Sequence, residues 1–100
     1  MTQATLFPTT IQERFEDFDR RHPEVYQLLL RLAREVKSRG LGHCGIGLLW
    51  ERARWFYVIE CDAGEEYKLQ DHYRSRYARK IMAEYPEFAG FFETRRLRAS

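Results

Sequence analysis

The stretch WFYVIEC, residues 55–61, decides which fold class the sequence predicts. β-Branched and aromatic residues are enriched in strands, so these seven residues favour a β-strand over a continued helix. The following DAGE is rich in turn-forming residues, and EYKLQ, residues 66–70, returns as a second strand. We therefore expect a β-hairpin at about residues 55–70, with its tip near DAG, residues 62–64.

Two helices are predicted near the amino terminus. Thr10 and Glu13 have the spacing of a capping box, in which each side chain satisfies a backbone NH of the other residue, and they open a helix from about Ile11 to Arg20. The strongest helical pattern is HPEVYQLLLRLAREVKSRG, residues 22–40, where Pro23 suits the first turn and Gly40 ends the helix. IGLLWERAR then begins a third, short helix that we expect to end near Arg54.

The helix predicted after the hairpin carries the most informative charge pattern. Asp71 is a good amino-terminal cap, and no breaker follows until Pro86. On a helical wheel Tyr73 and Tyr77 lie with Ile81 and Tyr85 on the buried side, and the opposite side is a basic face of His72, Arg76, Arg79 and Lys80. Arg74 is the exception, because it projects from the apolar side in the first turn. The basic face is either open to a partner or paired with acidic residues of the first helix: Glu13, Glu16, Asp17 and Asp19.

A short last helix is expected after Pro86, anchored by Phe88, Phe91 and Phe92. The predicted fold class is therefore mainly α (α+β): a small helical domain of four to five helices with one β-hairpin, similar to a winged helix-turn-helix. The expected layout is a flexible amino terminus over residues 1–9, a single domain over 10–96 and a basic tail over 97–100.

Length and composition limit the class of protein. One hundred residues, 44% of them hydrophobic, fit one small domain. No apolar run is long enough to span a membrane and no leader-like segment opens the chain, so we expect a cytoplasmic protein. Neither a cofactor nor a metal site is expected, because the four soft ligands lack the short paired spacings of zinc sites: His43, Cys44, Cys61 and His72.

Four segments together carry a resemblance to a known group of proteins. HPEVYQLLLRLAREVKSRG, WERARWFYVIE, YKLQDHYRSRYARKIM and FFETRRLR cover nearly the whole chain. In this combination they resemble a family of small uncharacterised proteins encoded by bacteriophages and prophages. The match in the third segment includes Tyr67, Lys68, Tyr77, Ala78 and Arg79. The resemblance implies a phage setting within a bacterial host cell, in which small DNA-binding regulators, recombination accessories and binders of host proteins occur.

The charge distribution favours duplex DNA as the partner. Residues 1–70 hold 10 Lys and Arg against 11 Asp and Glu, a net charge of −1, whereas residues 71–100 hold 7 against 4, a net charge of +3. Arginine pairs bidentately with phosphate, and cationic faces release condensed counterions from DNA. The sequence therefore predicts a DNA-binding protein that contacts phosphates through the basic face of residues 71–85. The predicted contact residues are Lys68, His72, Arg74, Arg76, Arg79, Lys80, Arg95 and Arg96.

The alternative is a protein-binding module, either a homodimer or an inhibitor of a host or phage protein complex, without DNA binding. Fifteen aromatic residues in 100 exceed what a small core readily buries. The residues expected in an exposed patch are Trp50, Trp55, Tyr57, Phe91 and Phe92. We do not expect an enzyme, because His43 beside Cys44 is the only adjacent pair of base and nucleophile, and sequence neighbours rarely point at each other.

Overall fold

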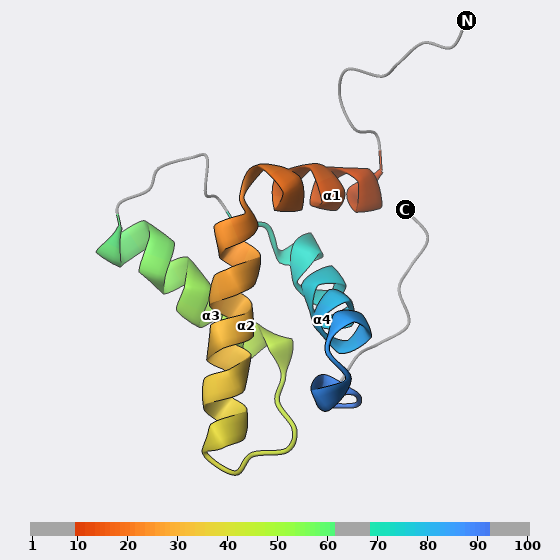
Figure 1. The fold of residues 1–100 in the computed structure, drawn as a ribbon. Coiled ribbons are helices and arrows are strands. Elements are labelled where there is room, and N and C mark those ends of the chain that lie inside the picture. The colour runs from red at the N-terminus through yellow and green to blue at the C-terminus, as the bar shows by residue number, and fades with distance from the viewer. Residues whose placement is uncertain (1–9, 62–68, 93–100) are drawn as a thin grey trace, which may run out of the picture.

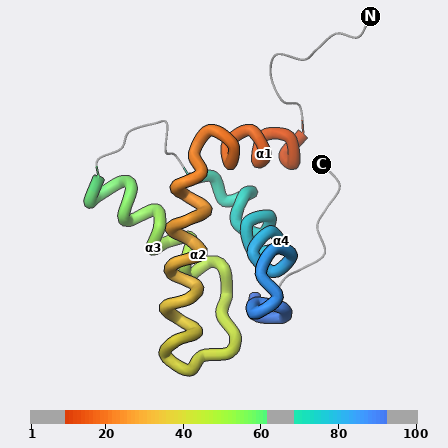
Figure 2. The backbone as a smooth tube through the Cα atoms, viewed as in Figure 1, coloured from red at the N-terminus to blue at the C-terminus, as the bar shows by residue number. Residues whose placement is uncertain are grey.

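Four α-helices make up most of the computed structural model, which describes residues 10–61 and 69–92. They are α1 (Ile11–Arg21), α2 (Pro23–Ser38), α3 (Ile46–Trp55) and α4 (Arg74–Glu84). Figure 1 shows α1 lying across the upper ends of α2 and α4, while α3 begins on the α4 side of α2, passes behind α2 and runs outward beyond it. The tube in Figure 2 follows the turn below α2, where the chain reverses and leads back up into α3.

The residues predicted to begin the first two helices and to end the second are confirmed in these positions. Glu13 donates its backbone NH to Thr10 Oγ1 at 3.0 Å and its carboxylate accepts the Thr10 NH at 3.0 Å, which completes the capping box. Pro23 occupies the first turn of α2. Gly40 follows the end of α2 with a φ of 91°, a left-handed conformation that glycine adopts without a steric cost.

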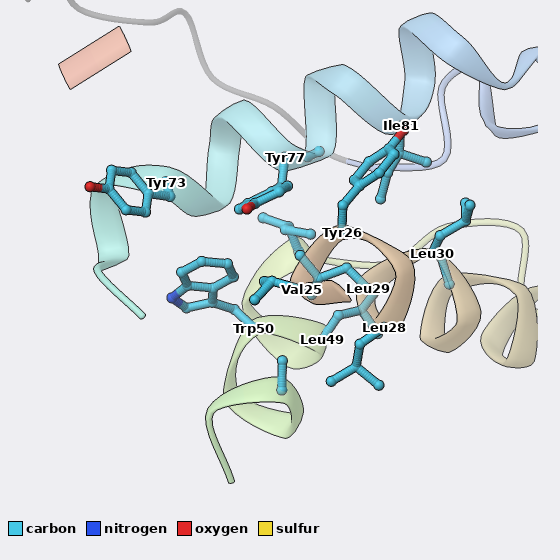
Figure 3. Packing of buried hydrophobic residues seen from close by; sticks show 14 of the residues in the cluster. Val25, Tyr26, Leu28, Leu29, Leu30, Leu49, Trp50, Tyr73, Tyr77 and Ile81 are labelled. Carbon is cyan, nitrogen blue, oxygen red and sulfur yellow. The ribbon is translucent and has the colours of Figure 1, made fainter. Parts of the chain in front are cut away.

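The core lies where α2, α3 and α4 meet. Trp50 and Tyr77 are fully buried there, with ring centroids 5.7 Å apart. Phe15 brings α1 to the same cluster through an edge contact with Tyr77 at 4.7 Å. Figure 3 shows Trp50 below Tyr73 and Tyr77, beside the leucine-rich side of α2. Tyr73, Tyr77 and Ile81 are all buried, as the wheel predicts, so the apolar face of α4 is confirmed.

The predicted hairpin is wrong, and with it the winged-helix fold class. The described residues contain no strand or sheet, and Phe56–Glu60 continue α3 as a π-helical turn, η1, in which Cys61 donates its NH to the Phe56 carbonyl at 2.9 Å. Helical continuation keeps Tyr57 on the buried side of α3, one turn after Ala53. This packing outweighs the strand propensity of WFYVI, which is a weak and context-dependent preference. Most of the second predicted strand lies outside the described residues, and Leu69 and Gln70 are in neither helix nor strand.

The end of the described chain is a single turn instead of the predicted last helix. A 3₁₀ turn, η3 (Asp71–Tyr73), precedes α4, and another, η4 (Pro86–Phe88), follows it. Gly90, with a φ of 73°, then turns the chain so that the Phe91 carbonyl accepts the NH of Cys44 at 3.0 Å. Contacts to α2 hold this turn, since Lys37 lies 5.0 Å from the centroid of the Phe88 ring. The predicted flexible terminus 1–9 and basic tail 97–100 lie outside the described residues.

Within the described ranges, no helix combines the length and the apolar character that a bilayer crossing requires.

Substitution of a core leucine tests this packing. Leu29 is fully buried in the middle of α2, so Leu29→Ala leaves a cavity and should lower the free energy of unfolding by about 2–5 kcal/mol. Urea denaturation followed by circular dichroism measures the change. The control is Leu41→Ala, which truncates a leucine that is 55% exposed in the loop before α3 and should stay within about 0.5 kcal/mol of the parent protein. Equal effects of the two substitutions would contradict the core assignment.

Candidate functional site

Arg76, at the centre of the predicted basic face, is buried. Its side chain is the most buried of the arginines on α4, and the residue is only 9% exposed. Its Nε donates to Gln12 Oε1 on α1 at 2.9 Å, and its Nη1 donates to the His72 carbonyl at 3.3 Å. The guanidinium therefore ties α4 to α1.

Lys80 lies one turn further along α4 and is also engaged. Its ammonium forms an ion pair with Asp19 of α1, in which the side chains of Lys80 and Asp19 are 27% and 14% exposed. The same ammonium lies 4.1 Å from the centroid of the Tyr26 ring, a cation–π contact. The Tyr26 hydroxyl donates to Glu84 Oε1 at 2.8 Å, and burial together with this bond raises the pKa of Tyr26 far above its usual value. The polar cluster therefore joins α1, α2 and α4.

The surface around this cluster has mixed charge. A hollow of about 420 Å³ opens between α1 and α4, and its charged walls hold three cationic and three anionic side chains. They are Arg76, Arg79 and Lys80 against Glu16, Asp19 and Glu84. A phosphate that approached this hollow would meet carboxylates as well as cations, so its attraction is weaker than the sequence of α4 by itself indicates.

The other predicted contact residues are dispersed. His72, in η3, and Arg74, the first residue of α4, are exposed. The Arg74 guanidinium lies beside the beginning of α3, where a Cβ placed on Gly47 would be 3.7 Å from Nη1. Three predicted residues lie outside the described part of the chain: Lys68, Arg95 and Arg96.

Asp71 links the end of α3 to the start of α4 through an ion pair. Its Oδ1 accepts a hydrogen bond from Arg54 Nη2 at 2.5 Å, and the Arg54 guanidinium holds the pKa of Asp71 below its usual value. The sequence predicts Asp71 as a helix cap, but the caps of η3 and α4 are Gln70 and Tyr73, and Asp71 is the first residue of η3. The pair is a surface contact between the two helices, with the side chains of Arg54 and Asp71 36% and 62% exposed.

Exposed apolar side chains collect on one side of α3 and η1. Among the described residues, five large apolar side chains are more than half exposed, and four of them belong to this segment. Leu48 is 65% exposed, Trp55 and Val58 are 56% exposed, and Ile59 is 57% exposed. We call these four side chains the outer face of α3–η1.

Helix geometry explains why these four residues face outward. Trp50, Ala53 and Tyr57 are buried, and at about 100° per residue Leu48 and Trp55 fall on the opposite side of α3. Ile59 follows in the π-helical turn η1 and is also exposed. Val58 lies beside them. Of the patch predicted from the sequence, only Trp55 is exposed, while Trp50, Tyr57, Phe91 and Phe92 are buried. A helical wheel extended through Glu60 is the signal that identifies Leu48 and Ile59.

A shallow groove borders the outer face on the side of α2. It has a volume of about 520 Å³, and Phe56 and Tyr57 of η1 form one wall of it. Arg31 and Arg34 stand on the α2 wall with Glu24 and Gln27. Burial raises the pKa of the Tyr57 hydroxyl, so this group is neutral at physiological pH. None of the described residues that line the groove belongs to the outer face.

The two cysteines differ in their exposure to solvent. Cys44 is buried before α3, and Cys61 is an exposed free thiol at the end of η1. Within residues 10–61 and 69–92, no three His, Cys, Asp or Glu side chains gather closely enough to hold a metal ion. The exposed Cys61 is consequently a native attachment point for a probe next to the outer face.

No protein-family model, curated protein or solved structure matches this chain. The resemblance to phage and prophage proteins therefore stays a prediction.

Removing the Lys80 side chain tests whether the basic face stabilises the fold. Lys80→Ala leaves Asp19 unpaired and part-buried and removes the contact with Tyr26. We expect the free energy of unfolding to fall by about 1–3 kcal/mol in urea denaturation. Arg39→Ala removes the exposed pair with Glu35 and should cost less than about 0.5 kcal/mol. A Lys80 effect no larger than that of Arg39 would mean that this face is only solvated.

Proposed function

We propose that this chain is a protein-binding module and that the outer face of α3–η1 receives a helix of a partner protein. The observation that carries the proposal is the gathering of Leu48, Trp55, Val58 and Ile59, each more than half exposed, on one helix. Apolar patches of this kind on small proteins are commonly interaction sites. Tryptophan is also among the residues most enriched in the energetic centres of interfaces.

A helical partner fits the shape of this surface. The apolar row runs along the helix from Leu48 to Ile59, so it presents a narrow strip and not a deep pocket. Residues four and seven positions apart on one helix form the ridge that packs against a second helix. The charges of Glu51 and Glu60 border the strip and supply a polar rim, while Arg52 lies within the row.

The geometry favours this function over the predicted phosphate contacts. Arg76 is buried and donates to Gln12, and Lys80 forms an ion pair with Asp19. Both cations therefore already have partners within the molecule. The outer face of α3–η1, by contrast, has no large neighbouring element within the described residues that covers it. A bound protein would remove these apolar side chains from water, which is the main source of association free energy.

Substitution of Trp55 tests the proposal. Affinity capture from extracts of cells that express the chain uses three baits: the parent protein, Trp55→Glu and Leu41→Glu. Leu41 is 55% exposed but lies in the loop before α3, so Leu41→Glu is a matched control for an added charge at an exposed apolar site. A protein recovered by the parent and the control is then purified, and its Kd for Trp55→Glu should be at least about ten-fold weaker. Binding that is insensitive to Trp55, together with no self-association that depends on Trp55, would contradict the proposal.

Binding to duplex DNA stays a prediction from the sequence, and a titration separates it from protein binding. Fluorescence anisotropy of a labelled duplex at low salt should give no saturable binding at micromolar protein if the cations of α4 are used internally. Salt-dependent binding that Arg74→Glu weakens and Arg39→Glu leaves unchanged would favour DNA instead. Arg74 and Arg39 are both exposed, so neither variant disturbs the core.

A further inference from the structure

The sequence spacing of the outward-facing side chains along α3–η1 is the same from either end of the segment. Leu48, Arg52, Trp55 and Ile59 follow one another at intervals of four, three and four residues. Two α-helices that pack side by side use this alternation of three and four, and here the last interval runs through the π-helical turn η1. Because the intervals are the same in both directions, the helix matches an antiparallel copy of itself in one register.

That register pairs chemically compatible residues. It places Leu48 against Ile59 of the second copy at both ends of the contact. At the centre it places Arg52 against Trp55 of the second copy, so that a guanidinium lies on an indole ring, a favourable cation–π arrangement. Arg52 is available for this contact, because its pair with Glu60 at 3.3 Å is half-exposed, and such surface pairs contribute little free energy.

A parallel arrangement is disfavoured by charge. It would place Arg52 beside Arg52 of the second copy and Glu51 beside Glu51, and like charges at one level of an interface repel each other. The antiparallel register moves the two Arg52 residues about 4.5 Å apart along the helix axis and the two Glu51 residues about 7.5 Å apart. Closed two-fold dimers are also the most common assembly of identical chains, and they require a surface that is complementary to itself.

We propose that the occupant of the outer face of α3–η1 is a second copy of this chain, packed antiparallel about a two-fold axis between Arg52 and Trp55. This inference rests on the proposed function of that face and names its partner. The four apolar side chains expose on the order of 400 Å² per copy, about half of what a standard interface buries on each partner. The dimer is therefore weak, with dissociation in the micromolar range.

A charge-exchange experiment tests the register. Leu48→Glu and Ile59→Lys each place a charge against an aliphatic residue of the second copy, so sedimentation velocity should show each variant alone as a monomer. When the two are mixed, the antiparallel register pairs the introduced glutamate with the introduced lysine at one end and restores the native pair at the other. The mixed dimer should associate at least about ten-fold more tightly than either variant alone. Leu41→Glu should dimerise like the parent protein.

Spin labels on the native Cys61 provide a second measurement. In the antiparallel register the two Cys61 Cα atoms are separated by on the order of 20–25 Å, from a rise of about 1.5 Å per residue. Double electron–electron resonance that gives a distance distribution in that range supports the register, provided that oxidation forms no disulfide between copies. Ready formation of a Cys61 disulfide indicates parallel packing and overturns it. Circular dichroism of each variant confirms that the fold is retained.

Failure of this inference is distinguishable from failure of the proposed function. A parent protein that sediments as a monomer at several hundred micromolar, or a mixture that gains no affinity, overturns self-association in this register. The binding of a different protein that depends on Trp55 would still support the outer face as a docking surface, since that experiment reports on the face and not on its symmetry.

Discussion

Burial of Trp50 and Tyr57 on one side of the helix formed by α3 and η1 fixes the rest of the surface. Trp50 is fully buried in α3 against Tyr77 of α4, and Tyr57 is buried in the π-helical turn that continues α3. Because Trp50 and Tyr57 occupy the inner side of this helix, Leu48, Trp55 and Ile59 lie on its outer side. The exposed apolar row is therefore a consequence of how the core is packed, and it persists because a change of rotation would expose Trp50.

The charged residues between α1 and α4 show that a basic face predicted for a partner can instead form contacts within the fold. Four basic residues on one side of α4 look like a surface for an anionic partner when α4 is considered alone. The approach of α1 brings Gln12 and Asp19 to Arg76 and Lys80, and Tyr26 of α2 completes the cluster. A buried guanidinium without these partners would be costly, so the charges specify how α1 sits across the other helices.

Local signals in the sequence predicted the helices whose ends have clear chemistry. The pair of Thr10 and Glu13 fixed the start of α1, Pro23 and Gly40 bounded α2, and the spacing of Tyr73, Tyr77 and Ile81 identified the inner side of α4. These features depend on residues within one or two turns of each other. The sequence therefore contains enough information to place them without knowledge of the packing.

The errors concern features that depend on distant parts of the chain. WFYVI has strand propensity, but its conformation is decided by the contact of Tyr57 with the core, which no local pattern reveals. The burial of Arg76 likewise depends on where α1 lies. The candidate site was predictable only in part: Trp55 was named from composition, whereas Leu48 and Ile59 became visible once the helix was known to continue.

The central claim is that the outer face of α3–η1 is covered by the same face of another copy. Isotope-filtered NMR on a mixture of labelled and unlabelled chains observes this contact directly, because only cross-peaks between different chains are retained. The account predicts cross-peaks between the methyl groups of Leu48 and Ile59, and between the Arg52 side chain and the Trp55 indole. Cross-peaks between chains that arise from α1 or α4 instead, or their absence at millimolar concentration, would contradict it.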